Sequence, residues 1–124
     1  MSGAPKLSFL TFYSLDPQVT ATFYGEFGIG FQSEKHGKGP LHYSFESNGL
    51  IVEIYPATEH TKQRQTATLG FEVNDADEAA QIAARNDYEI LALPRETSLG
   101  KRVIVADPDG RHVFLYSKIP ETDG

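Results

Sequence analysis

The chain has 124 residues, enough for one domain of ordinary size, and its 40% hydrophobic and 23% charged residues are typical of a globular protein. It contains no cysteine, which excludes disulfides, thiolate metal sites and cysteine nucleophiles. The net charge of −6 disfavours nucleic acid as a partner and favours cationic or neutral ligands. No apolar run could span a bilayer and the N-terminus has no signal-peptide core, so we expect a cytoplasmic protein with neither membrane nor nucleic acid as partner.

The first half of the sequence alternates strand and helix signals. Asp16 followed by Pro17 predicts the start of a helix, which ends at Gly28. Asn48-Gly49 predicts a two-residue hairpin turn. Strands are predicted over residues 7–13, 31–34, 41–47 and 50–55.

The second half repeats this order. Asp75, with Glu78 three residues later, is a capping box for a helix over residues 76–85. Strands are predicted over residues 68–73, 88–93, 102–106 and 111–117. A shift of 59 residues superposes Leu10 on Leu69 and Asp16 on Asp75. Two α/β stretches can resemble each other by chance, but the matched caps, hairpins and spacing favour a duplication.

The predicted fold class is therefore α+β, with two tandem βαβββ modules in a single domain, residues 1–124. The first module covers about residues 6–56 and the second about residues 67–117. A polar linker, residues 57–66, joins them, and residues 118–124 are expected to form a frayed tail.

Several short motifs occur in the order and spacing of a known family. They are Phe23-Tyr24, residues 28–31, residues 49–55, residues 69–73, Pro94 with Gly100, and residues 107–111. On these motifs, from Leu7 to Tyr116, the chain resembles the vicinal-oxygen-chelate superfamily of glyoxalase I, extradiol dioxygenases and bleomycin-resistance proteins. The resemblance implies a curved mixed sheet around a cleft, helices on its outer face, and a homodimer.

The same resemblance implies a divalent metal held by side chains on the inner faces of the first and last strands of each module. Glu53 matches one ligand position. The other positions fall on Phe9, Thr68 and Phe114, which offer one hydroxyl among them. We therefore predict no metal and no other cofactor.

The Asn48-Gly49 turn sets a register in which Phe45 pairs with Val52 and Ser44 with Glu53. One face of this hairpin is then apolar, and the other carries mixed side chains. At residues 107–110 a turn with a bulge pairs Ile104 with Phe114 and Arg102 with Tyr116. Together with the first strand of each module, these patterns predict the ligand-binding residues Phe9, Thr11, Tyr13, His42, Ser44, Glu53, Tyr55, Thr68, Glu72, Arg102, Phe114 and Tyr116.

This aromatic and partly acidic lining suits a flat apolar ligand that carries a positive charge. The alternative is that the aromatic side chains collapse on one another. His42 lies diagonally across from Glu53, where the two could form an acid–base pair or half of a metal site, although a solvated strand histidine is favoured. His36, His60 and His112 are expected at the surface. Residues 94–100 form a loop that could close over the cleft, although an ordinary connector is favoured.

Two functions follow from these observations. The first is a metal-free protein of the glyoxalase/bleomycin-resistance type that sequesters a cationic or aromatic small molecule. The alternative is an enzyme: a glyoxalase-like lyase or isomerase or a dioxygenase with a relocated metal, or a metal-free catalyst that uses Glu53 and His42.

Overall fold

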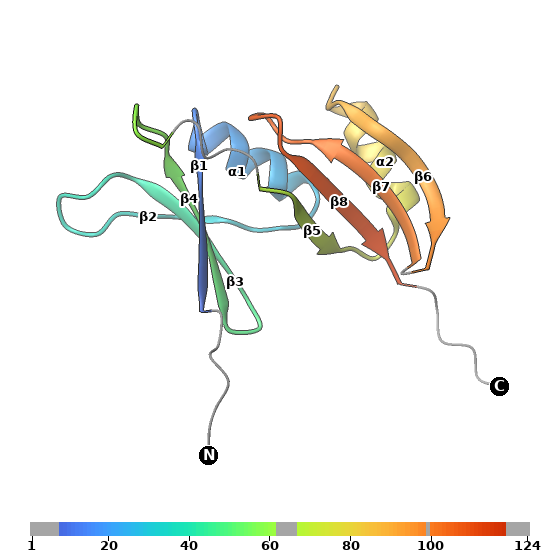
Figure 1. The fold of residues 1–124 in the computed structure, drawn as a ribbon, viewed down its shortest axis with the longest axis horizontal. Coiled ribbons are helices and arrows are strands. Elements are labelled where there is room, and N and C mark those ends of the chain that lie inside the picture. Colours follow the sequence, from blue (N-terminus) through green and yellow to red (C-terminus); the bar gives the residue numbers. More distant parts are fainter. Residues whose placement is uncertain (1–7, 62–66, 99, 119–124) are drawn as a thin grey trace, which may run out of the picture. The chain divides into compact units, whose positions relative to one another are not determined.

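Both predicted βαβββ modules are present in the computed structural model, which describes residues 8–61, 67–98 and 100–118 (Figure 1). The chain divides into two compact units, Met1–Gln65 and Thr66–Gly124, and each is a four-stranded mixed sheet with one helix. The α+β class and the two-module plan are therefore confirmed. Leu7, the second half of the predicted linker and most of the predicted tail lie outside the described residues.

The first module is built from β1 (Phe9–Ser14), α1 (Pro17–Glu26), β2 (Gln32–Glu34), β3 (His42–Ser47) and β4 (Leu50–Pro56). The strands lie in the order β1-β4-β3-β2. Strands β1 and β4 are parallel, and the other neighbours are antiparallel.

Local sequence signals account for the elements of this module. The Asp16 carboxylate accepts a hydrogen bond from the backbone N–H of Val19 at 3.3 Å, and Pro17 occupies the first turn of α1. At the hairpin, Asn48 and Gly49 have φ values of 51° and 88°, as a type I′ turn requires. The predicted pairings of Ser44 with Glu53 and Phe45 with Val52 are confirmed.

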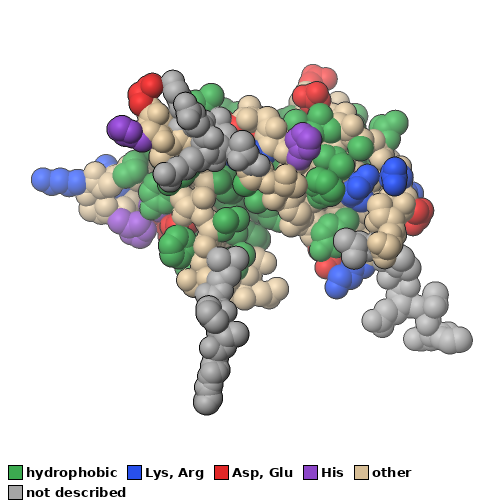
Figure 2. All heavy atoms as spheres, in the orientation of Figure 1, with side chains coloured by type: hydrophobic (Ala, Val, Ile, Leu, Met, Phe, Trp, Pro, Cys, Tyr) green, Lys and Arg blue, Asp and Glu red, His purple; other side chains and the backbone are tan. Residues whose placement is uncertain are grey.

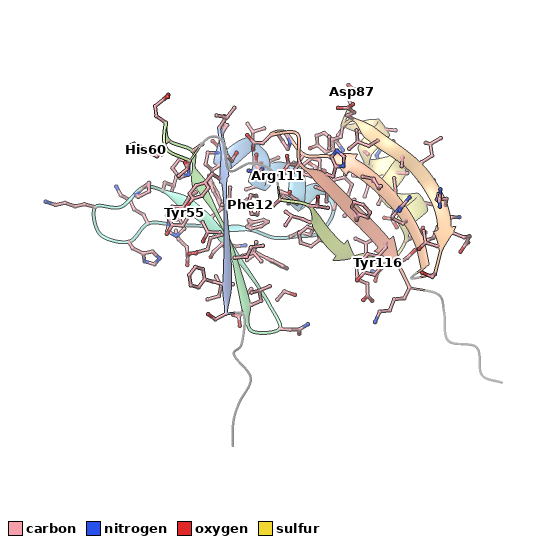
Figure 3. The ribbon with its side chains drawn as sticks, viewed as in Figure 1. Phe12, Tyr55, His60, Asp87, Arg111 and Tyr116 are labelled. Carbon is pink, nitrogen blue, oxygen red and sulfur yellow. The ribbon has the colours of Figure 1, made fainter. Side chains whose placement is uncertain are left out.

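Helix α1 covers one face of the first sheet. Phe12, Phe23, Tyr24 and Ile54 are each at most 2% exposed, and the Phe12 and Tyr24 rings meet edge to face at 6.1 Å. Since alternate residues of a strand point to opposite faces, Thr11, Glu53 and Tyr55 lie on the face away from the helix. Figure 3 shows Phe12 and Tyr55 on opposite sides of β1 and β4.

The second module is built from β5 (Leu69–Glu72), α2 (Ala76–Arg85), β6 (Ile90–Thr97), β7 (Gly100–Ala106) and β8 (His112–Ser117), in the order β5-β8-β7-β6. Helix α1 begins at residue 17 and ends at 26, and α2 begins at 76 and ends at 85, so a shift of 59 residues superposes them end to end. The Asp75 carboxylate caps α2 by accepting from the N–H groups of Asp77 and Glu78.

The core of this module is aliphatic. The buried residues of α2 are Ala76, Ala79 and Ala83, and the sheet contributes Val103, Val105, Val113 and Leu115. The predicted pairings of Ile104 with Phe114 and Arg102 with Tyr116 are confirmed.

The prediction of a loop over residues 94–100 is wrong. Strand β6 continues through Pro94 to Thr97, and β7 already begins at Gly100. Proline has no N–H to donate, but β6 is an edge strand and its pairing with β7 shifts register between Ala92 and Arg95, so Pro94 can be accommodated there. This segment therefore belongs to a hairpin and is not a lid.

Neither helix in the described part of the chain has the length and apolar character needed to cross a membrane. On the face shown in Figure 2, hydrophobic side chains lie among the charged ones.

Candidate functional site

The helix-free face of the first module gathers seven of the predicted ligand-binding residues. Parallel pairing of β1 with β4 places Phe9 beside Ile51, Thr11 beside Glu53 and Tyr13 beside Tyr55. Strand β3 adds His42 and Ser44 to this face. The seven residues are Phe9, Thr11, Tyr13, His42, Ser44, Glu53 and Tyr55, and we call them the mixed face.

Glu53 lies in the middle of the mixed face, and its side chain is 20% exposed. The Thr11 hydroxyl donates a hydrogen bond to Glu53 Oε1 at 3.1 Å. On the other side of Glu53, Ser44 is its paired neighbour on β3. The carboxylate is thus held in place by the neighbouring strand, while part of it still meets solvent.

The expectation of a solvated His42 is wrong, because this side chain is only 1% exposed. Its ring stacks on the ring of Tyr55, with centroids 4.2 Å apart and planes 9° from parallel. Its Nε2 atom lies 3.3 Å from Glu34 Oε1 and 3.9 Å from Glu53 Oε2. Stacking and the strand β2 beside it enclose a histidine that strand alternation alone would place in water.

Tyr55 lies against His42 and near the two carboxylates. Burial raises the pKa of its hydroxyl above the ordinary value, and the negative charges of Glu53 and Glu34, with a smaller effect of Tyr13, raise it further. The hydroxyl therefore stays protonated at neutral pH, where it can donate a hydrogen bond to a ligand.

Two residues of this region were not predicted as site residues, Glu34 and His36. Antiparallel pairing of β2 with β3 sets Glu34 directly opposite His42. His36 is exposed, as expected, but its ring centroid lies 5.1 Å from that of His42. Antiparallel pairing of the short strand 32–34 with the start of β3, had it been assumed from the sequence, would have placed Glu34 opposite His42.

The second module carries the other five predicted residues, and their setting differs. Phe114, Arg102 and Tyr116 share the helix-free face of this sheet by register, with the Arg102 guanidinium 5.4 Å from the centre of the Phe114 ring. Thr68 is exposed and directly precedes β5. Glu72 is exposed and forms an ion pair with Lys118 at 3.4 Å.

The residues at the positions that the family resemblance assigns to a metal do not fit one. Glu53 has a carboxylate, but Phe9 and Phe114 have no lone pair to donate and Thr68 offers a single neutral hydroxyl. A divalent transition metal needs three or four nitrogen, sulfur or carboxylate donors. We therefore assign no chemistry to a metal at these positions.

Comparisons with known proteins identify the family. The family model of the Glyoxalase/Bleomycin resistance protein/Dioxygenase superfamily matches residues 6–113. The chain belongs to this superfamily. No curated protein sequence matches it.

Solved structures of the superfamily share its fold. TnmS3, described as an antibiotic binding protein from Streptomyces sp. CB03234, is similar with a TM-score of 0.73 at 15% identity, covering 96% of this chain and 100% of the other. A glyoxalase-related enzyme from Fulvimarina pelagi gives a TM-score of 0.68 at 19% identity, covering 98% and 96%. A glyoxalase/bleomycin resistance protein/dioxygenase family enzyme from Burkholderia phytofirmans PsJN gives a TM-score of 0.69 at 15% identity, and the match covers 93% of this chain and 100% of the other. At these identities the likeness establishes the fold alone, and the three neighbours are described as one binding protein and two enzymes.

Proposed function

We propose that this member of the superfamily is a binding protein that sequesters a flat, cationic or aromatic small molecule on the mixed face, without a metal at the family's usual position. The observation that carries the proposal is Glu53, a partly exposed carboxylate in the middle of a strand with Tyr55 next to it. A carboxylate near aromatic rings attracts an aromatic cation by charge and by stacking.

Two further observations support the proposal. Phe9 is 60% exposed although it is large and apolar, so the mixed face offers apolar surface for a ligand. TnmS3, which shares the fold, is described as an antibiotic binding protein. The participation of Thr68, Glu72, Arg102, Phe114 and Tyr116, the homodimer and the cytoplasmic location are parts of this proposal that rest on the sequence alone.

A titration of Glu53→Gln with ethidium, a flat aromatic cation that reports binding by fluorescence, tests this function. The glutamine keeps an oxygen for the Thr11 hydroxyl, so the fold should remain intact while the counter-charge is lost. We expect binding to weaken by about 1–3 kcal/mol, which is roughly fivefold to 150-fold in Kd. Glu46→Gln is the matched control, because Glu46 is an exposed acid on the same face and its loss removes the same charge.

The outcomes separate the parts of the proposal. Equal affinity of Glu53→Gln and Glu46→Gln would contradict the role of Glu53. Failure of the wild type to bind ethidium would contradict the ligand class.

One observation favours the alternative, an enzyme. His42 Nε2 lies 3.9 Å from Glu53 Oε2, so a small movement would join an imidazole and a carboxylate in an acid–base pair. Turnover of an α-oxoaldehyde by the wild type that is lost in both His42→Gln and Glu53→Gln would establish this alternative.

A further inference from the structure

Three potential metal ligands of the first module lie close together where β2 ends and β3 begins. They are the carboxylate of Glu34 and the imidazoles of His36 and His42, and their ligand atoms all lie within 4.8 Å of one another. Glu34 Oε1 lies 3.3 Å from His42 Nε2 and 3.8 Å from His36 Nε2. Pairing of β2 with β3 fixes two of the three, and His36 follows two residues after Glu34.

A contact of the Nδ1 atom with the backbone orients the ring of His42. Nδ1 lies 3.2 Å from the carbonyl oxygen of Pro40. A carbonyl oxygen only accepts hydrogen bonds, so Nδ1 carries a hydrogen and Nε2 is left to act as a donor of its lone pair. This arrangement, with one ring nitrogen bonded to a backbone carbonyl, is the usual one for a metal-bound histidine.

The Nε2 atom of His42 has no hydrogen-bond partner among the described residues, although it is buried. It nevertheless faces two carboxylates, those of Glu34 and Glu53. A buried nitrogen that makes no hydrogen bond beside two carboxylates is unfavourable, and a cation bound among these atoms would balance the negative charge and use the nitrogen lone pair.

The distances agree with a tetrahedral ion. Zinc bonds of about 2.0–2.1 Å place tetrahedral ligand atoms about 3.3 Å apart. The Glu34–His42 pair already has this separation, and His36, on an exposed part of the chain, needs only a small movement. Two imidazoles and one carboxylate suit zinc and similar transition metals better than Mg²⁺ or Ca²⁺, which prefer oxygen ligands.

We propose that Glu34, His36 and His42 bind a zinc-type divalent ion, with Glu53 beside them as a further carboxylate. None of the three stands at a position that the family resemblance assigns to a metal. The exposed His36 gives the ion a path from solvent. Three protein ligands leave one coordination position for water or for a donor atom of a bound molecule. The site shares His42 and Glu53 with the mixed face, but its test uses Zn²⁺ alone and does not require the ligand proposed above.

Calorimetric titration of the untagged, chelator-stripped full chain with Zn²⁺ tests this site. We expect one ion per chain at micromolar affinity or tighter. His36→Ala should weaken binding at least about tenfold without affecting the fold, because His36 is exposed and its loss leaves the core unchanged. His60→Ala is the matched control: His60 is an exposed loop histidine of the same module outside the cluster, and its replacement should leave binding unchanged.

A second readout uses Co²⁺ in place of Zn²⁺. A tetrahedral site gives intense visible absorption, which should appear in the wild type and in His60→Ala and be lost in His36→Ala and Glu34→Gln. Absence of stoichiometric zinc binding by the wild type would overturn the proposal. Equal binding by His36→Ala and His60→Ala would also overturn it.

Discussion

The two modules share one backbone plan but place different chemistry at equivalent positions. The pairings of Leu10 with Val52 and of Leu69 with Val113 make Glu53 equivalent to Phe114, and Thr11 equivalent to Gly70. The hydrogen-bonded carboxylate of the first sheet is thus replaced by a phenyl ring in the second. A duplicated fold preserves its register because the core requires it, while the helix-free face is free to diverge.

Two buried charged or polar side chains, one in each module, also differ, although among the described residues Arg102 Nε in the second module is unsatisfied as well. In the first module, His42 Nε2 is buried beside two carboxylates without a hydrogen bond. In the second, the guanidinium of the buried Arg111 contacts Asp107 at 3.0 Å and Asp109 at 3.3 Å, and the Asp107 carboxylate also accepts from two backbone N–H groups. Polar groups that satisfy one another support the fold, whereas an unsatisfied buried group such as His42 Nε2 needs a specific explanation, which the proposed ion supplies.

The largest effect that would sharpen this comparison is expected from Arg111→Met. The substitution removes the guanidinium that contacts the carboxylates of Asp107 and Asp109, whose side chains are at most 3% exposed. We expect a loss of about 3–5 kcal/mol in the free energy of unfolding, measured by urea titration. Arg85→Met, an exposed site near the end of α2, should change it by less than about 0.5 kcal/mol. Similar values for the two variants would mean that the turn is not held by these ion pairs.

The β6–β7 hairpin should show the next largest effect. Gly100 has a φ of 130°, and a Cβ added there would overlap the carbonyl oxygen of Ser117. Gly100→Ala must therefore move backbone as well as strain φ, and we expect a loss of at least about 2 kcal/mol. Gly110→Ala, with a φ of 88° and nothing within 4 Å of the added Cβ, isolates the strain alone and should cost about 1 kcal/mol. Equal losses would show that Ser117 yields without cost.

Much of each module could be predicted from the sequence because local rules decide it. The Asn48-Gly49 turn admits one register, and that register places Ser44 beside Glu53. The caps at Asp16 and Asp75 give the starts of both helices correctly. The resemblance to the superfamily gave the fold as a whole.

Features that depend on packing between segments could not be predicted in this way. His42 is buried because it stacks on Tyr55 and meets β2, a three-residue strand with a weak sequence signal. The cluster with Glu34 and His36 was missed for the same reason. Residues 94–100 were predicted as a loop, but β6 continues through Pro94 because it lies at an edge of the sheet, where proline is tolerated.

The two helix caps offer a direct comparison of the modules with a smaller effect. The Asp75 carboxylate accepts from two N–H groups, at 2.9 Å and 3.2 Å, whereas Asp16 accepts from one, at 3.3 Å. Pro17 also presets the backbone of α1 without the carboxylate. We expect Asp75→Ala to cost about 1–2 kcal/mol and Asp16→Ala about 0.5–1 kcal/mol by urea unfolding. The reverse order would show that cap geometry does not determine the difference.

The smallest effect is expected at an ion pair found in the second module. Lys101 Nζ on β7 donates to Asp77 Oδ2 at 2.7 Å in the first turn of α2, and both side chains are well exposed. This hydrogen bond, followed by the charge of Asp77, raises the pKa of Lys101 above its ordinary value. Because the folded-state pKa is the higher one, the pair stabilises the fold below the unfolded-state pKa of about 10.4, and that contribution is lost as the pH rises through the folded-state pKa.

Exposure to solvent screens such a pair, so Lys101→Met should differ little from the wild type at pH 7. A double-mutant cycle with Asp77→Asn at pH 7 and at pH 12 measures the coupling. We expect a small coupling at pH 7 that is smaller at pH 12, because the lysine loses its charge as the pH rises through its raised folded-state pKa. A coupling that persists undiminished at pH 12 would show that packing of the lysine chain, and not its charge, joins α2 to β7.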